Sequence, residues 1–79
     1  MYYTYILKCA DGTLYTGITT DLARRVGEHN VGSLGAKYTM ARRPVELVYS
    51  RKFKNRSTAS KEEARIKKMN RVEKLELVK

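Results

Sequence analysis

Apolar and polar side chains alternate along the first residues of the chain, which predicts a β-strand over residues 2–9 (YYTYILKC). The side chains expected to share one face are Tyr3, Tyr5, Leu7 and Cys9. A period of two with aromatic and β-branched residues is typical of a strand. Asp11-Gly12 suits a tight turn, and residues 13–18 (TLYTGI) then predict the returning strand of a β-hairpin, which places Tyr15 beside Tyr5.

After residue 18 the spacing of apolar residues changes to that of a helix. The residues that could cap this helix are Thr19, Thr20 and Asp21. Leu22 and Val26 form its apolar stripe, and Arg25 and His29, one turn apart, flank the stripe on one side. The side chains expected to face away are Arg24 and Glu28.

The next segment, residues 30–44, contains glycines and the only proline, which favours a long loop. Residues 45–50 (VELVYS) predict a third strand, on which Val45, Leu47 and Tyr49 share a face. The basic residues 51–57 are expected to follow the strand rather than belong to it.

Two helices are predicted in the last third of the chain. Ser57 or Ser60 would cap the first, which runs to about Met69. The residues expected on its buried stripe are Ala59, Glu63 and Ile66, with Glu62 toward the edge. Residues 70–73 (NRVE) resemble a capping box for a short last helix. The residues expected on its inner side are Val72, Leu75 and Val78.

This order of elements predicts an α/β fold of the α+β type over residues 1–79, as a single domain. A three-stranded, mainly antiparallel sheet would be flanked by three helices. A chain of this size buries only about 60% of the surface that it exposes when unfolded. We therefore expect one small core and no room for a separate regulatory domain.

The net charge of the chain indicates what kind of partner it binds. Seventeen Lys and Arg residues against eight acidic residues give a formal charge of +9. An excess of this size favours a polyanionic partner, and DNA is the expected one. A solvated basic surface with no partner is the plain alternative. A membrane-surface helix is disfavoured because the basic residues occur in every segment.

Cysteine content and the first residues bear on location. The single cysteine, Cys9, allows no intrachain disulfide and suits a reducing compartment. A small buried side chain is the expected role of Cys9, and a nucleophilic pair with His29 is a remote alternative. The first twelve residues lack the features of a signal peptide or a membrane span. We expect a soluble, cytoplasmic protein with no membrane partner and no small-molecule cofactor.

Several residues bear chemistry, and each also has an ordinary structural explanation. Glu63 could hold a metal or could close a capping box with Ser60. Arg25 could clamp a phosphate or form a surface ion pair, and His29 and the tyrosines could be core residues. Together, two tyrosines, an arginine, a histidine and a half-buried glutamate form a possible phosphodiesterase set. One carboxylate can hold Mg²⁺, which takes waters and substrate phosphate as its other ligands.

The motifs that contain these residues resemble the GIY-YIG nuclease superfamily. TYI at residues 4–6, followed ten residues after Tyr5 by YTG at residues 15–17, is similar to the two half-motifs of the family. The stretches TTDLARRVGEHN, GAKYT, RRPVELVY and ASKEEARIKKMNRVEKL are similar to its small stand-alone bacterial members, the UPF0213-like group. The resemblance spans nearly the whole chain.

The resemblance implies a metal-dependent endonuclease that hydrolyses DNA, in repair or recombination, with one Mg²⁺ or Mn²⁺ ion. By position in the motifs, the catalytic residues are Tyr5, Tyr15, Arg25, His29 and Glu63. Water activated near Tyr15 would attack phosphorus, Arg25 would stabilise the charge that develops, and Glu63 would hold the metal. Tyr5 and His29 would orient water or substrate, and either tyrosine or His29 could take the proton. Gly17 matches the motif glycine. The basic residues expected to contact the DNA backbone are Lys37, Arg42, Arg43, Lys52 and Lys54.

The chain also departs from the family pattern. Tyr3, Thr4 and Thr16 replace motif Gly and Ile residues, and the asparagine that many family nucleases place near the C-terminus is not found. A nucleic-acid-binding module with a vestigial site is therefore the second hypothesis. A protein-interaction domain is the third. Salt-dependent DNA binding and metal-dependent cleavage distinguish the three.

Overall fold

The computed structural model describes residues 1–31 and 35–78 of the chain. The elements, in chain order, are β1 (Tyr2–Lys8), β2 (Leu14–Thr19), α1 (Leu22–Asn30), α2 (Lys37–Met40), β3 (Glu46–Phe53), α3 (Arg56–Lys67) and α4 (Arg71–Leu77). The predicted α+β class, with an antiparallel three-stranded sheet, is confirmed. The short helix α2 is an addition to the three predicted helices.

The sheet has the order β2-β1-β3 and both pairs of strands are antiparallel. β1 and β2 form the predicted hairpin, in which Tyr5 lies opposite Gly17. The turn matches its sequence, because Gly12 has a φ of 85° and the Asp11 carboxylate accepts hydrogen bonds from the backbone N–H and hydroxyl of Thr13. β1 is thus the central strand, and β2 is an edge strand.

β3 is longer than predicted and has an irregular register. It continues through the basic residues to Phe53, because strand pairing with β1 extends to Tyr2. Leu47 pairs with Leu7 and Tyr49 with Ile6, so Val48 is left without a partner. This bulge reverses the alternation of faces. The prediction that Val45, Leu47 and Tyr49 share a face is therefore wrong for Tyr49. Leu47 pairs with Leu7, which packs with Val45 in one core cluster, whereas Tyr49 pairs with Ile6 and donates to Glu62 of α3.

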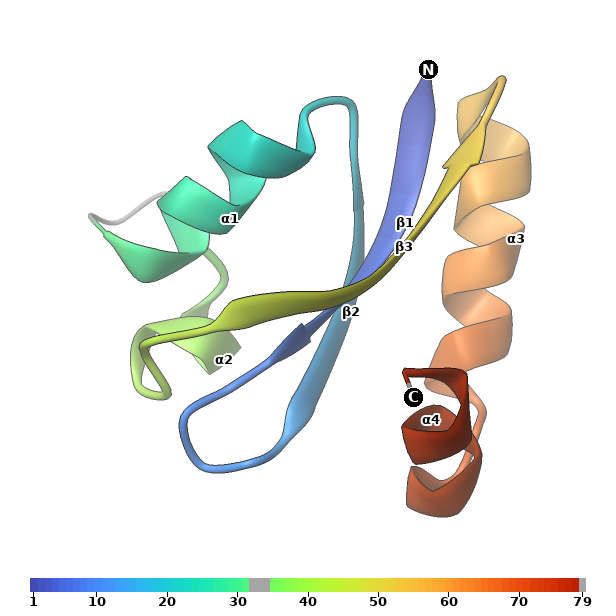
Figure 1. Ribbon diagram of the computed structural model, residues 1–79. Coiled ribbons are helices and arrows are strands. Elements are labelled where there is room, and N and C mark those ends of the chain that lie inside the picture. The colour runs from blue at the N-terminus through green and yellow to red at the C-terminus, as the bar shows by residue number, and fades with distance from the viewer. Residues whose placement is uncertain (32–34, 79) are drawn as a thin grey trace.

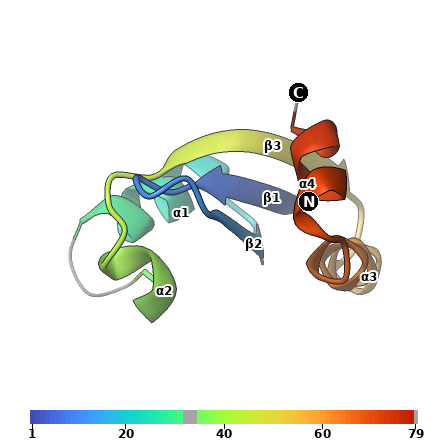
Figure 2. The same cartoon turned by 90° about the horizontal axis from the view of Figure 1, so that it is seen from below.

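The helices cover both faces of the sheet. α1 and α2 lie on one side, and α3 and α4 on the other (Figures 1 and 2). On the α1 side, the core consists of Tyr5, Leu7, Cys9 and Val45, with Tyr15, Leu22 and Val26 packed against it. On the α3 side, the hydroxyl of Thr4 donates to the carbonyl oxygen of Ala59 at 2.8 Å. The alternation predicted for β1 places these two sets on opposite faces.

α1 begins as the sequence predicts. Asp21 is the N-cap, and its carboxylate accepts a hydrogen bond from the backbone N–H of Arg24 at 3.0 Å. Arg24 faces solvent as expected. Glu28 does not face away, because its side chain is only 22% exposed and accepts a hydrogen bond from Arg25.

α3 begins earlier than predicted. Asn55 caps it by accepting from the backbone N–H of Thr58, so neither Ser57 nor Ser60 is the cap and the proposed Ser60 capping box is wrong. The buried residues of α3 are Ala59, Glu62 and Ile66. Glu62 rather than Glu63 is therefore the more deeply buried carboxylate.

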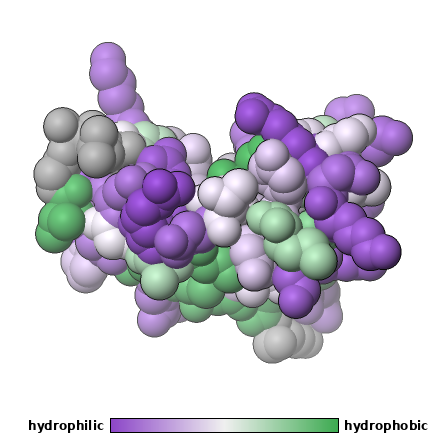
Figure 3. Space-filling view, turned by 90° about the horizontal axis from the view of Figure 1, so that it is seen from above, coloured by the Kyte–Doolittle hydropathy of each residue, from purple (hydrophilic) through white to green (hydrophobic). Residues whose placement is uncertain are grey.

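α4 has the predicted capping box, in which Asn70 and Glu73 each accept a hydrogen bond from the other's backbone N–H. Its predicted inner side is wrong for two of the three residues, because Val72 is 69% and Leu75 42% exposed, whereas Val78 is half-buried. Within the described residues every helix is too short or too polar to span a lipid bilayer. Viewed from the end where α1 and α3 begin, hydrophilic residues gather on two lobes with a notch between them (Figure 3).

Candidate active site

The site is built around Tyr5 and the glycine opposite it. The ring of Tyr5 lies across the backbone of Gly17, and a Cβ atom at Gly17 would be 2.6 Å from the Tyr5 hydroxyl oxygen. Only a glycine leaves room for this arrangement. Because Gly17 is on the edge strand β2, the buried hydroxyl of Tyr5 lies close to that edge of the sheet.

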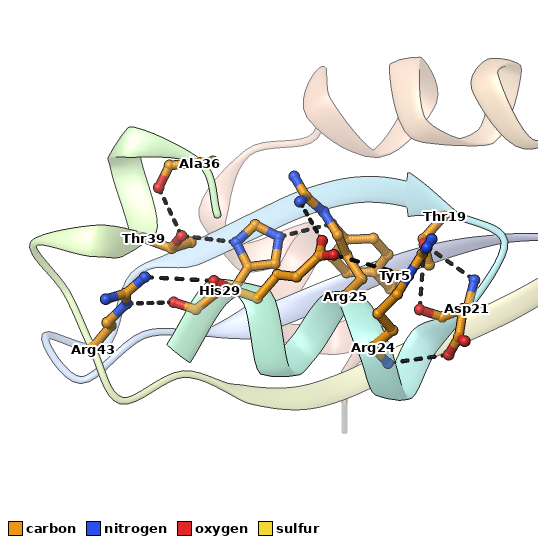
Figure 4. A network of polar contacts seen from close by, with 10 residues as sticks. Tyr5, Thr19, Asp21, Arg24, Arg25, His29, Ala36, Thr39 and Arg43 are labelled. Atoms are coloured by element: carbon orange, nitrogen blue, oxygen red, sulfur yellow. Dashed lines mark hydrogen bonds and ion pairs between the residues drawn. The ribbon is translucent and has the colours of Figure 1, made fainter. Parts of the chain in front are cut away.

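A chain of three hydrogen bonds starts at this hydroxyl (Figure 4). Tyr5 Oη lies 3.0 Å from His29 Nε2, and His29 Nδ1 lies 2.8 Å from Thr39 Oγ1. The Thr39 hydroxyl donates to the Ala36 carbonyl oxygen at 2.9 Å. All three side chains are fully buried.

The last bond sets the direction of the others. The hydrogen of the Thr39 hydroxyl is used by Ala36, so Thr39 Oγ1 accepts from the Nδ1–H of His29. Nε2 of the neutral imidazole is then an acceptor, and Tyr5 donates to it. This tautomer follows from the hydrogen-bond pattern.

The electrostatic surroundings keep His29 neutral. Burial lowers the pKa of the imidazole, and the nearby charges of Arg25 and Arg43 lower it further, against an opposing contribution from Glu28. Neutral His29 is the form that can accept the Tyr5 hydrogen. Burial also raises the pKa of Tyr5, so its hydroxyl keeps its proton at rest.

Arg25 lies between Tyr5 and solvent. Its Nη1 donates to Glu28 at 2.9 Å, and its side chain remains 27% exposed. A hydrogen bond from Arg25 and its positive charge lower the pKa of Tyr5, in opposition to burial. The guanidinium is thus close enough to the Tyr5 hydroxyl for both to contact one substrate group.

Glu63 and Tyr15 complete the cluster. Burial raises the pKa of Tyr5, and the negative charge of Glu63 on α3 adds a small contribution in the same direction, so this carboxylate acts on Tyr5 although α1 and α3 lie on opposite faces. Its side chain is 24% exposed and pairs with Lys67 at 3.3 Å. The Tyr15 ring lies 5.2 Å from the His29 ring and stacks on Tyr38 at 5.9 Å.

The structure therefore brings together four of the five side chains predicted from the motifs, those of Tyr5, Tyr15, Arg25 and His29, and Glu63 acts on this group from α3 through its charge. Two neighbours were not predicted. Thr39 belongs to a segment predicted as loop, and a single threonine there gives no pattern that marks it. Glu28 was expected in solvent, although its spacing of three residues from Arg25 is a signal for an ion pair on one helix.

The carboxylates differ in what they could bind. Glu62 accepts from Arg65 at 2.8 and 2.7 Å and pairs with Arg51, and the Arg65 contact holds its pKa below the usual range, so it is fully engaged. Among the residues that the structure describes, Glu63 pairs only with the exposed Lys67. No group of three His, Cys, Asp or Glu side chains that could hold a metal occurs in the described ranges. The single carboxylate of Glu63 fits an Mg²⁺ ion completed by waters and a substrate phosphate.

The five basic residues expected to contact DNA do not form one patch. Arg43 donates to the carbonyl oxygens of His29 at 2.6 Å and Glu28 at 3.4 Å, and thereby holds the end of α1. Arg42 pairs with Asp11 and lies 4.0 Å over the Tyr38 ring. The remaining three are exposed, with Lys37 on α2 and the other two, Lys52 and Lys54, near the opposite end of the sheet (Figure 1).

Comparison with known proteins places this arrangement in context. Residues 1–76 match the family model described as the GIY-YIG catalytic domain. The chain is 55% identical to the UPF0213 protein DP2720 of Desulfotalea psychrophila over 99% of its own length and 71% of that protein. It is 54% identical to a UPF0213 protein of Syntrophus aciditrophicus, over 98% of this chain and 88% of that one.

Solved structures agree with the fold. The solution NMR structure of the UPF0213 protein BH0048 from Bacillus halodurans matches 99% of this chain and 83% of that chain, with a TM-score of 0.63 and 43% identity. The solution NMR structure of the protein EF2693 from E. faecalis matches 92% and 77% of the two chains, with a TM-score of 0.62 and 47% identity.

Proposed function

Because the chain belongs to the GIY-YIG family, we propose that it is an endonuclease that hydrolyses phosphodiester bonds in DNA with the help of one Mg²⁺ or Mn²⁺ ion. The observation that supports this most is the directional hydrogen-bond chain Tyr5–His29–Thr39 with Arg25 and Glu63 beside its outer end. It combines a path for a proton, a fork for phosphate oxygens and a carboxylate for a metal.

The proton path begins at the attacking water. By analogy with the family this water would lie beside Tyr15, and the hydrogen bonds offer its proton a route away. As the water oxygen bonds to phosphorus, its proton passes to Tyr5 Oη, while the Tyr5 hydrogen passes to His29 Nε2. The resulting imidazolium still donates from Nδ1 to Thr39. The P–O bond to the leaving group breaks, and the leaving oxygen is protonated from solvent.

Arg25 and a metal ion held by Glu63 would stabilise the negative charge of the phosphate. Arg25 can donate two parallel hydrogen bonds to the nonbridging oxygens, whose negative charge grows in the transition state. Glu63 would hold the metal ion, which supplies positive charge for the leaving oxygen when it is bound. Lys67 must release Glu63 for this, and an exposed pair of this kind is weak.

A second candidate is a DNA-binding module with a vestigial site. Asn70 is the only asparagine after Glu63, and its side chain caps α4. It therefore offers no further ligand to the site.

Cleavage separates the two candidates. The pure protein is incubated with linear, nicked, branched, damaged and single-stranded DNA, in Mg²⁺ or Mn²⁺ and in EDTA. Metal-dependent cleavage of any of these supports the nuclease. Salt-sensitive binding without cleavage supports the module. Absence of both would leave the protein-interaction domain.

A further inference from the structure

A hollow of about 330 Å³ lies beside Arg25, at the end of the sheet where α1 and α3 begin. Its lining includes Tyr2, Thr20, Arg24, Arg25, Glu28 and Arg56. These residues come from β1, α1, α3 and the β2–α1 turn, so the hollow joins the two helical layers. We call it the arginine hollow. Neither Arg24 nor Arg56 is among the catalytic or DNA-contacting residues predicted from the sequence.

The arginine hollow has an excess of positive charge. Three guanidinium groups face a single carboxylate in its lining, that of Glu28. Glu28 lies 2.9 Å from Arg25 and 3.9 Å from Arg24, so it is committed mainly to Arg25. Arg56 is exposed and forms no ion pair with any residue that the structure describes. An anion in the hollow would therefore find guanidinium donors that are not already saturated.

The hollow is continuous with the candidate active site. Arg25 lines the hollow and also acts on the Tyr5 hydroxyl. Arg56 and Glu63 are seven residues apart on α3, so they lie on the same side of the helix, about 10 Å from each other along its axis. A phosphate at Arg56 is therefore not the one at Glu63. The hydrophilic lobes of Figure 3 lie on this end of the molecule.

We propose that the arginine hollow binds a second phosphate group of the nucleic-acid backbone, next to the scissile one, through Arg24 and Arg56. The proposal rests on the proposed function for its ligand, a phosphodiester strand, but not on catalysis. Each guanidinium offers a planar fork that matches phosphate oxygens. Thr20 and Tyr2, which also line the hollow, have hydroxyl groups that could donate to the same phosphate. The hollow would fix the position of the strand relative to Arg25.

The test is a binding cycle carried out in EDTA, so that it does not depend on cleavage. A short oligonucleotide is made with a neutral methylphosphonate at one linkage at a time. The parent protein should bind more weakly when the methylphosphonate replaces one particular linkage in the stretch that it contacts. Arg56→Gln should bind the unmodified strand more weakly, and the slope of log affinity against log salt concentration should be smaller by roughly 1. In this variant, a methylphosphonate at the linkage that mattered for the parent should have no further effect on binding.

Lys61→Gln is the matched control. Lys61 is an exposed cation on the same helix and is not part of the hollow, so it should bind every modified strand as the parent does. Arg24→Gln should reproduce the Arg56 result at the same linkage. If Arg56→Gln binds like Lys61→Gln, or if its effect is the same at all linkages, the proposed subsite is wrong. If the parent binds with the expected cycle but never cleaves DNA, the subsite stands and the nuclease proposal fails.

Discussion

Thr39 determines which nitrogen of His29 bears the hydrogen, although it does not touch the expected substrate position. Its own hydroxyl hydrogen is held by Ala36, which leaves Oγ1 as an acceptor for Nδ1–H. This makes Thr39 a positioning residue. Its influence on the chemistry passes through His29 to Tyr5.

Thr39→Val should remove that control. The Nδ1–H of His29 would be buried without an acceptor, which typically costs about 1–3 kcal/mol in the free energy of unfolding. Cleavage should also slow, because His29 could then adopt the tautomer that donates to Tyr5. Denaturant unfolding and single-turnover cleavage measure the two effects. Thr39→Ser should restore both, and a valine variant as stable and active as the parent would contradict the assigned hydrogen-bond direction.

Glu63 and Arg25 should separate binding from chemistry. Glu63→Ala should abolish cleavage and leave DNA binding in EDTA unchanged or stronger, because a carboxylate repels phosphate unless a cation lies between them. Arg25→Ala should weaken binding and slow cleavage by roughly 100-fold or more, since its charge acts in both the ground and transition states. Single-turnover cleavage with excess enzyme, beside a binding titration, makes the comparison.

The exposed Glu46 on β3 provides a control for charge alone. Glu46→Ala should cleave like the parent. Should Glu63→Ala cleave equally fast, Glu63 would be a structural residue and the metal proposal would be lost.

At the scale of elements, Gly17 shows why β2 has the sequence it has. Gly17→Ala should destabilise the fold by about 1–3 kcal/mol, because the new methyl group would overlap the Tyr5 ring, whose nearest atoms lie at 2.6 and 2.8 Å. Gly27→Ala is the contrasting substitution. Nothing lies within 4 Å of its Cβ position in α1, so it should stabilise the protein by roughly 0.5–1 kcal/mol. Thermal or denaturant unfolding checks both, and similar shifts for the two variants would refute the steric argument.

The elements that the sequence predicted correctly have strong local signals. The β1–β2 hairpin has alternation and an Asp-Gly turn, α1 has an Asp cap and a clear stripe, and α4 has its capping box. The failures have long-range causes. The bulge at Val48 depends on pairing with β1, and helix α2 is one turn long and is held by the contact of Thr39 with His29.

The candidate site was predictable in part for the same reason. Spacing placed Arg25 and His29 on one side of α1, and the hairpin placed Tyr5 beside β2. Periodicity alone ranked Glu63 as the buried acid of α3, but Glu62 is buried instead, where it meets Tyr49 and Arg51 of β3. Side-chain partners on other elements cannot be read from the spacing within one element.

At the scale of the whole molecule, the single histidine links global stability to pH. Burial and the charges of Arg25 and Arg43 lower the pKa of His29, so the unfolded chain binds its proton more readily. The contribution of neutral His29 to the free energy of unfolding should be fully present above about pH 6.5, and it should be lost as the pH falls from that value toward the lowered pKa. Urea unfolding between about pH 7.5 and 5 measures this dependence.

His29→Gln is the informative comparison, because the chain has no other histidine. The variant should be less stable at neutral pH but should lose little further stability down to about pH 5. An equally steep loss in the variant would mean that other groups cause the effect.

The central position of β1 also limits how the gene for this domain can change in length. Tyr5 and Leu7 serve the α1 face, and Thr4 serves α3. Insertion of one codon within β1 would exchange these faces for every residue on one side of it, which removes Tyr5 from the site and buries the wrong side chains at once. Insertions in the Asp11-Gly12 turn leave both faces intact. Length variation among viable descendants should therefore collect at the turns, while β1 changes only by substitution.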